Sequence, residues 1–249
     1  MSKQEIEGSS GADELSKEAD DRFWKGLGQQ PPISVLDESG IGLVRRRLAN
    51  AEKKSVPTYL KFKYRKQETS TAAVLVALCT VNGKVSVLFE ERNNKLSSHS
   101  GEVCFAGGKA DPTDTSLEHT ALRETYEEIG IASEDVRVIG KLPPIPNYNF
   151  TMRVFPIVGV VGSSRLDLQS LNVNKTEVHR VFALPLEHFL DPKNRSAVPF
   201  RNTKVMIPSY KSDKPGLRIW GLTAFILHEF LRRIADPNND TAPVSAPSL

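Results

Sequence analysis

The sequence has few cysteines, little net charge and no long hydrophobic run. Cys79 and Cys104 are the only cysteines in 249 residues, so a fold held together by disulfides is not expected. Each lies in an apolar, strand-like run, which indicates two buried free thiols in a reducing compartment. No stretch approaches the roughly 18 apolar residues that a membrane helix needs. The net charge of +3 is too small to indicate nucleic-acid binding, because 33 basic residues nearly balance 30 acidic ones.

Both ends of the chain are polar. We expect residues 1–38 to be a largely disordered leader that docks locally, at most, through Phe23 and Trp24. Residues 237–249 are expected to be a flexible tail, which leaves a single domain at 39–236. The basic cluster KFKYRK at 61–66 is interpreted as a solvated linker.

The terminal residues bear on the compartment. The N-terminal stretch is acid-rich and resembles neither a secretory signal nor a mitochondrial presequence. The last three residues, Pro247-Ser248-Leu249, share only the leucine with the SKL signal of peroxisomal proteins. We therefore expect the cytoplasm, with the peroxisome as the alternative. The oligomeric state stays open.

The domain pattern is rich in strands. Two β-type runs, 71–81 and 84–92, flank Asn82-Gly83, which predicts a tight hairpin. Helices are expected at 41–53, where Leu43, Val44 and Leu48 share one side, and at 221–236, before Pro237. Further strands are expected at 136–142, 154–161 and 178–184. This order indicates an α+β fold without regular βαβ alternation.

The most informative segment runs from Gly107 to Ile131. Paired glycines, Gly107 and Gly108, allow a backbone turn to approach a phosphate without an intervening Cβ. A helix follows, for which Asp114 or Thr115 is the expected N-cap and Gly130 the residue that ends it. Four residues of this helix form an apolar stripe at helical spacing: Leu117, Ala121, Thr125 and Ile129.

Three glutamates lie beside that stripe. Glu124, Glu127 and Glu128 have i, i+3 and i+4 spacing, and like charges so close together destabilise a helix. A divalent cation with a preference for hard oxygen ligands, Mg²⁺ or Mn²⁺, would relieve the repulsion and bridge the carboxylates to substrate phosphates. Arg123 can pair with a flanking carboxylate. A solvated acidic face is the alternative for an isolated Glu pair, but the adjoining Gly-Gly turn argues against it.

These residues resemble the box of the Nudix hydrolase family. Its second half, Arg-Glu-aliphatic-x-Glu-Glu-x-Gly-aliphatic, matches from Arg123 to Ile131. Thr125 replaces the aliphatic residue, and Asp114 stands where glutamate is usual, one residue farther from Arg123. The resemblance implies an α/β/α sandwich with a mixed sheet, and metal-dependent hydrolysis of a diphosphate linkage in a nucleotide derivative.

The segment before the box resembles the signature of the coenzyme A diphosphatase branch of that family. Arg92, Gly101, Phe105 and the paired glycines match, whereas Ser97 and Ala106 replace an arginine and a proline. The implied products are adenosine 3′,5′-bisphosphate and 4′-phosphopantetheine. Another nucleoside diphosphate derivative, such as ADP-ribose or a dinucleotide, is the alternative substrate. A non-catalytic nucleotide-binding module is the alternative of another class.

Roles for individual residues follow from the proposed chemistry. The metal ligands are Glu124, Glu127 and Glu128, and a bound ion would activate the attacking water and neutralise charge on the phosphates. The general base is Glu124, Glu128 or Glu177, which opens a strand after the box. Arg123 supports the carboxylates. The residues expected to contact substrate are Arg92, Gly107, Gly108 and Lys109. No nucleic-acid or membrane partner is expected.

Overall fold

The structure is a computed structural model that describes residues 24, 27–28, 31–53, 70–162, 166–199 and 206–240. Its helices are α2 (Glu38–Lys53), α3 (Leu117–Ile129), α4 (Leu186–Leu190) and α5 (Gly221–Ala235). The larger sheet contains β1 (Ser70–Val81), β2 (Lys84–Arg92), β3 (Val103–Cys104), β4 (Gly107–Lys109), β5 (Val136–Lys141), β6 (Ile145–Pro146), β7 (Met152–Val161) and β8 (Val178–Pro185). The smaller sheet contains β9 (Arg195–Pro199), β10 (Met206–Lys211) and β11 (Arg218–Ile219). The expectations for Phe23, for the basic cluster at 61–66 and for residues 241–249 lie outside the described residues.

The larger sheet is mixed, as the family resemblance implies. Its main path is β3-β2-β1-β7-β5, with β4 beside β1, β6 beside β7 and β8 beside β2. β1 and β7 run parallel, whereas the other pairs are antiparallel. The predicted hairpin joins β1 to β2, and Asn82 and Gly83 both have positive φ, as a type I′ turn requires.

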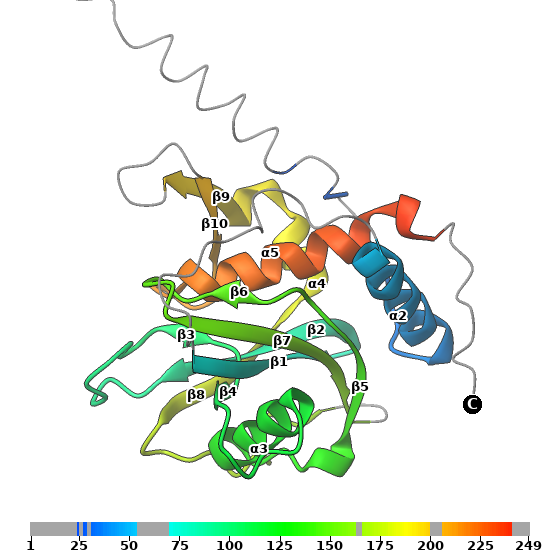
Figure 1. Cartoon of the computed structure of the whole chain (residues 1–249). Coiled ribbons are helices and arrows are strands. Elements are labelled where there is room, and N and C mark those ends of the chain that lie inside the picture. Colours follow the sequence, from blue (N-terminus) through cyan, green and yellow to red (C-terminus); the bar gives the residue numbers. More distant parts are fainter. Residues whose placement is uncertain are drawn as a thin grey trace, which may run out of the picture.

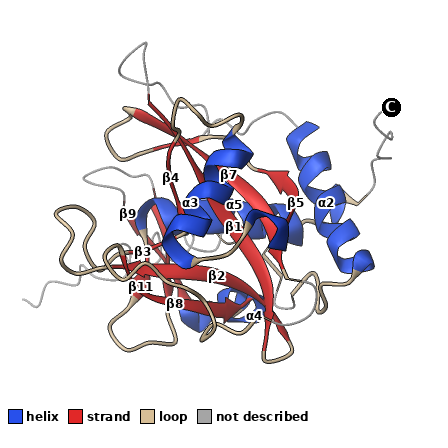
Figure 2. Cartoon of the chain, turned by 90° about the horizontal axis from the view of Figure 1, so that it is seen from below, coloured by secondary structure: helices blue, strands red, loops and turns tan. Residues whose placement is uncertain are grey.

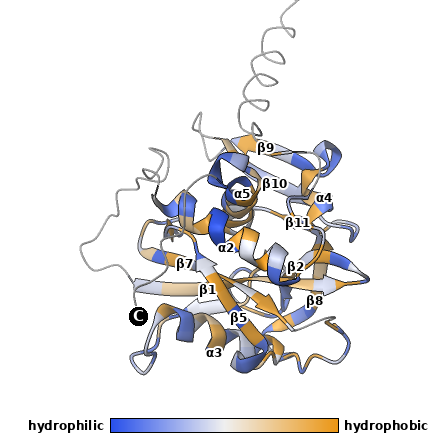
Figure 3. Cartoon of the chain, turned by 90° about the vertical axis from the view of Figure 1, so that its right-hand side faces the viewer, coloured by the Kyte–Doolittle hydropathy of each residue, from blue (hydrophilic) through white to orange (hydrophobic). Residues whose placement is uncertain are grey.

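Helices cover both faces of this sheet, which confirms the α/β/α sandwich (Figure 1). α2 and α5 lie on one face and α3 on the other, where Figure 2 shows it crossing the sheet. Alternate residues of β1 are therefore buried on opposite faces of the sheet. Val76 and Leu78 pack in the core between the sheet and α5, and Leu75 and Ala77 pack in the core between the sheet and α3. Hydrophobic residues accordingly follow the central strands between the helix layers (Figure 3).

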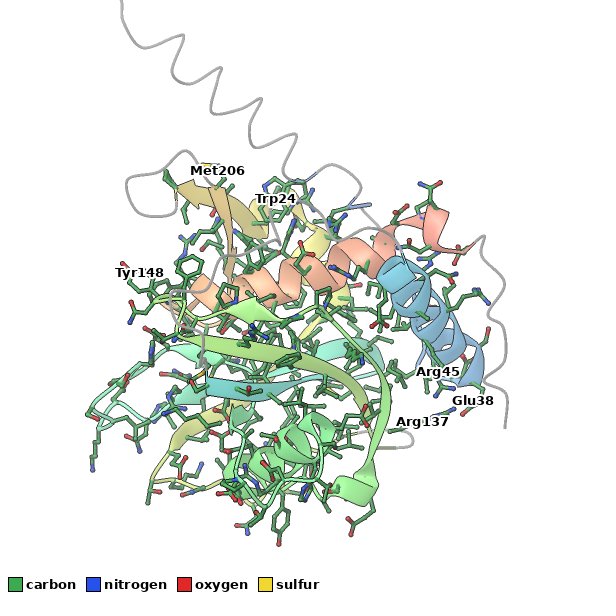
Figure 4. The ribbon with its side chains drawn as sticks, in the orientation of Figure 1. Trp24, Glu38, Arg45, Arg137, Tyr148 and Met206 are labelled. Atoms are coloured by element: carbon green, nitrogen blue, oxygen red, sulfur yellow. The ribbon has the colours of Figure 1, made fainter. Side chains whose placement is uncertain are left out.

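The helix expected at 41–53 begins three residues earlier, at Glu38. Glu38 pairs with Arg137 of β5 and so ties the start of α2 to the edge of the sheet (Figure 4). Helix α5 ends at Ala235, one residue before Asp236, where the sequence analysis places its end because Pro237 follows. Within the described ranges, none of the helices combines the length and the apolar character that crossing a membrane would require.

Trp24 packs against the folded domain, where its partners are residues that lie far from it in the sequence. Its ring lies 5.6 Å from the Tyr210 ring and 5.1 Å from the His228 ring, both in edge-on geometry. The Arg195 guanidinium lies over the same ring, 5.1 Å from its centre. Trp24 and these partners form an aromatic cluster, in which Trp24 lies beside the small sheet, on the side of α5 away from α3 (Figure 4).

Candidate active site

Helix α3 carries the glutamates and has defined ends. Its N-cap is Ser116, whose hydroxyl accepts a hydrogen bond from the His119 N–H at 3.0 Å. The prediction of Asp114 or Thr115 as N-cap is therefore wrong, because the Asp114 carboxylate binds other groups. Gly130 ends the helix in the left-handed conformation, with φ of 73°, as predicted.

The apolar stripe of α3 faces the sheet as predicted, with Ala121 and Ile129 buried and Leu117 partly buried. Thr125 is also buried, and its hydroxyl donates to the Ala121 carbonyl oxygen at 2.7 Å. A threonine is tolerated in the stripe because its hydrogen bond is made within the helix.

The three box glutamates differ in exposure because they lie at different angles from the buried stripe. The Glu128 side chain is 4% exposed, that of Glu124 18% and that of Glu127 53%. Burial, followed by the charge of Glu90, raises the pKa of Glu128. Burial likewise raises the pKa of Glu124, partly offset by Arg123.

The paired glycines bring backbone against these carboxylates. The Gly107 N–H donates to Glu128 Oε2 at 2.8 Å, and Gly107 has φ of 151°, where a side chain would also strike β1. At Gly108 an added Cβ would lie 2.5 Å from the carboxyl carbon of Glu124. Gly107 requires glycine because of its positive φ and the close approach of β1, whereas a side chain at Gly108 would displace the Glu124 carboxylate.

Arg123 is held by Asp114 in a two-pronged ion pair. Its Nε lies 2.9 Å from Asp114 Oδ1 and its Nη2 lies 3.0 Å from Oδ2. The guanidinium also reaches Glu124 at 3.0 Å and Glu127 at 3.1 Å. The Arg123 hydrogen bonds hold the pKa of Asp114 well below its usual range. Asp114 thus fixes the arginine that contacts two of the glutamates, a role that the sequence analysis did not assign to it.

The remaining predicted residues lie around the same helix at different distances. Arg92 Nη1 is 3.9 Å from Glu128 Oε1, at the end of β2. The Lys109 side chain is exposed, while its carbonyl oxygen accepts from Arg123 Nη2 at 3.2 Å. Glu177 is exposed just before β8, and its charge contributes to raising the pKa of Glu124. Arg92 and Glu177 therefore approach the box from strands beside α3.

One carboxylate of the site was missed by the sequence reasoning. Glu90 lies in β2, is only 1% exposed, and accepts a hydrogen bond from the Cys104 thiol at 3.2 Å. Burial raises its pKa, and the charges of Glu177 and Glu124 raise it further. In the sequence its signal is weak, because Glu90 follows the apolar run 87–89 but is the first of the three charged residues that end the strand.

The donor chemistry fits a divalent cation. Across the described ranges, no three His, Cys, Asp or Glu side chains form a ready-made metal cage. Mg²⁺, however, is commonly held by one or two carboxylates, with waters and substrate phosphates as its other ligands. The carboxylates at the site are hard oxygen donors, and Glu90 Oε2 is buried without a hydrogen-bond partner in the described part of the chain. A bound cation would compensate that buried charge.

Comparisons with known proteins identify the family of the chain. The family described as NUDIX domain matches residues 69–202. Nudix hydrolase 3 of Caenorhabditis elegans is 37% identical over 175 residues, which cover 65% of this chain and 72% of that protein. The mitochondrial coenzyme A diphosphatase NUDT8 of Homo sapiens is 41% identical over 170 residues, covering 67% of this chain and 70% of that protein. The peroxisomal coenzyme A diphosphatase NUDT7 of Mus musculus is 38% identical over 131 residues, covering 53% of each chain.

This chain belongs to the Nudix hydrolase family. Divalent metal ions are generally required by Nudix hydrolases.

Proposed function

We propose that this chain hydrolyses the diphosphate linkage of coenzyme A and its derivatives, releasing adenosine 3′,5′-bisphosphate and 4′-phosphopantetheine or its acyl form. The observation that carries the proposal is the position of Arg92, at the start of the coenzyme A-type segment, beside Glu128 of the box. Arg92 Nε is buried and has no hydrogen-bond partner among the described residues. A phosphate oxygen is a suitable acceptor for that N–H. Two relatives named as coenzyme A diphosphatases, at about 40% identity, add support.

Glu124, Glu127 and Glu128 are the proposed metal ligands, and Mg²⁺ or Mn²⁺ is the proposed ion. When bound, the ion would polarise the attacking water and neutralise charge on the diphosphate. Arg123, fixed by Asp114, holds Glu124 and Glu127 in place until substrate and ion arrive. Gly107 contributes its N–H to Glu128, which keeps that carboxylate directed toward the loop.

The reaction requires a base for one proton. Water oxygen bonds to one phosphorus, the bond from that phosphorus to the bridging oxygen breaks, and the water proton passes to a carboxylate. Glu124 is the proposed base because it is partly exposed and lies against the glycine loop. Glu128 and Glu177 are the alternatives, the latter because it is exposed at the edge of the same site.

Gly108 and Lys109 are proposed to contact the phosphates, the glycine through backbone and the lysine through its exposed side chain. The compartment proposed is the cytoplasm, with the peroxisome as the alternative, and a fluorescent fusion of the full chain would distinguish them.

A substrate panel tests the proposal. The full chain with Mg²⁺ or with Mn²⁺ is assayed on coenzyme A, an acyl derivative, dephospho-coenzyme A, ADP-ribose and NADH. The highest kcat/KM is expected for a coenzyme A compound, with a loss of at least about tenfold on removal of the 3′-phosphate, the scale of one lost charged hydrogen bond. Equal or higher kcat/KM on ADP-ribose than on every coenzyme A compound would refute the substrate class. Binding of these compounds without turnover would instead indicate a nucleotide-binding module.

A further inference from the structure

Glu90 faces α3 from the opposite wall of the site. In β2, side chains alternate between the two faces, and Leu88, two residues earlier, packs in the core below α3. A cavity of about 10 Å³ lies between Glu90 and the helix residues Thr125 and Ile129. Arg92, two residues later on the same face, reaches Glu128. Glu90 therefore lies between the apolar core and the box.

The Glu90 carboxylate is incompletely satisfied. Its Oε1 accepts a hydrogen bond only from a thiol, a weak donor, and its Oε2 is buried without a partner among the described residues. The adjacent Glu91 shows the contrast, because it is also buried but pairs with Arg180 on β8. A buried carboxylate oxygen without a partner is costly unless the functional state of the protein supplies one.

The charges around Glu90 point to the kind of partner. Glu124 and Glu177 repel it, and it repels Glu128, while the charge of Arg92 attracts it. Within this set the acidic groups outnumber the basic one. A small cation is the partner that would lower the energy of all the carboxylates at once.

We propose that Glu90 supplies a further carboxylate to the divalent-cation centre, from β2, opposite the glutamates of α3. The inference rests on the metal dependence in the proposed function and extends the donor set beyond the box helix. Glu90 thereby couples the sheet to the ion and sets the negative charge available to it.

The test measures Mn²⁺ affinity of the full chain in the absence of substrate, by titration calorimetry and by the electron paramagnetic resonance signal of free Mn²⁺. Glu90→Gln keeps the shape of the side chain and removes its charge. Its Mn²⁺ dissociation constant is expected to rise at least about tenfold. In EDTA the variant is expected to melt at the parent temperature or above, because a buried unpaired charge is gone. Glu90→Met, of similar volume, repeats the measurement if the Gln variant does not fold.

Two matched controls separate this role from a structural one. Glu91→Gln removes the neighbouring buried carboxylate on the other face and is expected to leave Mn²⁺ affinity within about twofold. Cys104→Ala removes only the thiol that binds Glu90 and is also expected to leave the affinity within about twofold.

An unchanged Mn²⁺ affinity in folded Glu90→Gln would overturn the inference, as would an equal loss in Cys104→Ala. In both cases the parent would still bind Mn²⁺ and hydrolyse its substrate, so the proposed function would stand. A parent that hydrolyses coenzyme A without binding Mn²⁺ or Mg²⁺ would contradict both.

Discussion

Replacing Trp24 with alanine is expected to lower stability while leaving the chemistry intact. Trp24 is 8% exposed and contacts the Tyr210 and His228 rings from a segment that precedes the first described helix. Its cluster lies beside α5, whereas the box glutamates lie on α3, across the sheet (Figure 1). Stability and turnover should therefore respond separately to this change.

The size of the effect can be bounded. Truncation of a buried aromatic residue to alanine costs about 3–5 kcal/mol. Because the Trp24 side chain is still 8% exposed and not fully enclosed, we take the lower value of about 3 kcal/mol. For a chain of about this length, 1 kcal/mol shifts the melting temperature by about 2–4 °C. The expected decrease in Tm is thus about 6–12 °C.

Thermal melts followed by circular dichroism measure the decrease, and kcat/KM is measured well below the transition. The control is Trp220→Ala, since the chain has only two tryptophans and Trp220 is 52% exposed. It should cost less than about 1 kcal/mol. Equal Tm shifts in the two variants, or a loss of turnover in folded Trp24→Ala, would refute the separation of the cluster from the site.

Three further changes test the site and the cluster. Glu128→Gln should lower kcat at least about 10²-fold with the fold retained, which steady-state kinetics at saturating metal would check. Gly108→Ala, which places a Cβ against the Glu124 carboxylate, should lower kcat/KM at least about tenfold, whereas Gly42→Ala in α2, with open space around its Cβ, should not. His228, whose pKa is lowered to about 4 by burial, should destabilise the fold as the pH falls from about 6.5 toward 4, because the unfolded chain takes up that proton first. Thermal melts of His228→Gln across this range should show a smaller acid-induced decrease than the parent.

The main elements could be predicted because their signals are local. Asn82-Gly83 requires positive φ at both positions, so the hairpin follows from the two residues themselves. The stripe on α3 follows from helical spacing alone. The small sheet was not predicted, because β9, β10 and β11 are short and Tyr210 and Ile219 are buried only where these strands pack on α5 and the rest of the core, which no local pattern shows. Burial of Trp24 is non-local for the same reason, since its partners lie about two hundred residues away along the chain.

The site shows the same division between local and non-local signals. Glu124 and Glu128 were identified because their spacing on one helix is visible in the sequence. Asp114 was predicted as an N-cap because aspartate is common at that position. Its carboxylate instead accepts two hydrogen bonds from Arg123, and these charged hydrogen bonds are stronger than one from a backbone N–H. Glu90 was missed because its place in the site depends on the packing of β2 against α3, and only the folded structure shows that packing. An acidic residue within a run that is to be buried on both faces needs a partner. Glu90 has a thiol and the charge of Arg92 near it, but its Oε2 accepts no hydrogen bond among the described residues, and this unmet requirement points to a ligand.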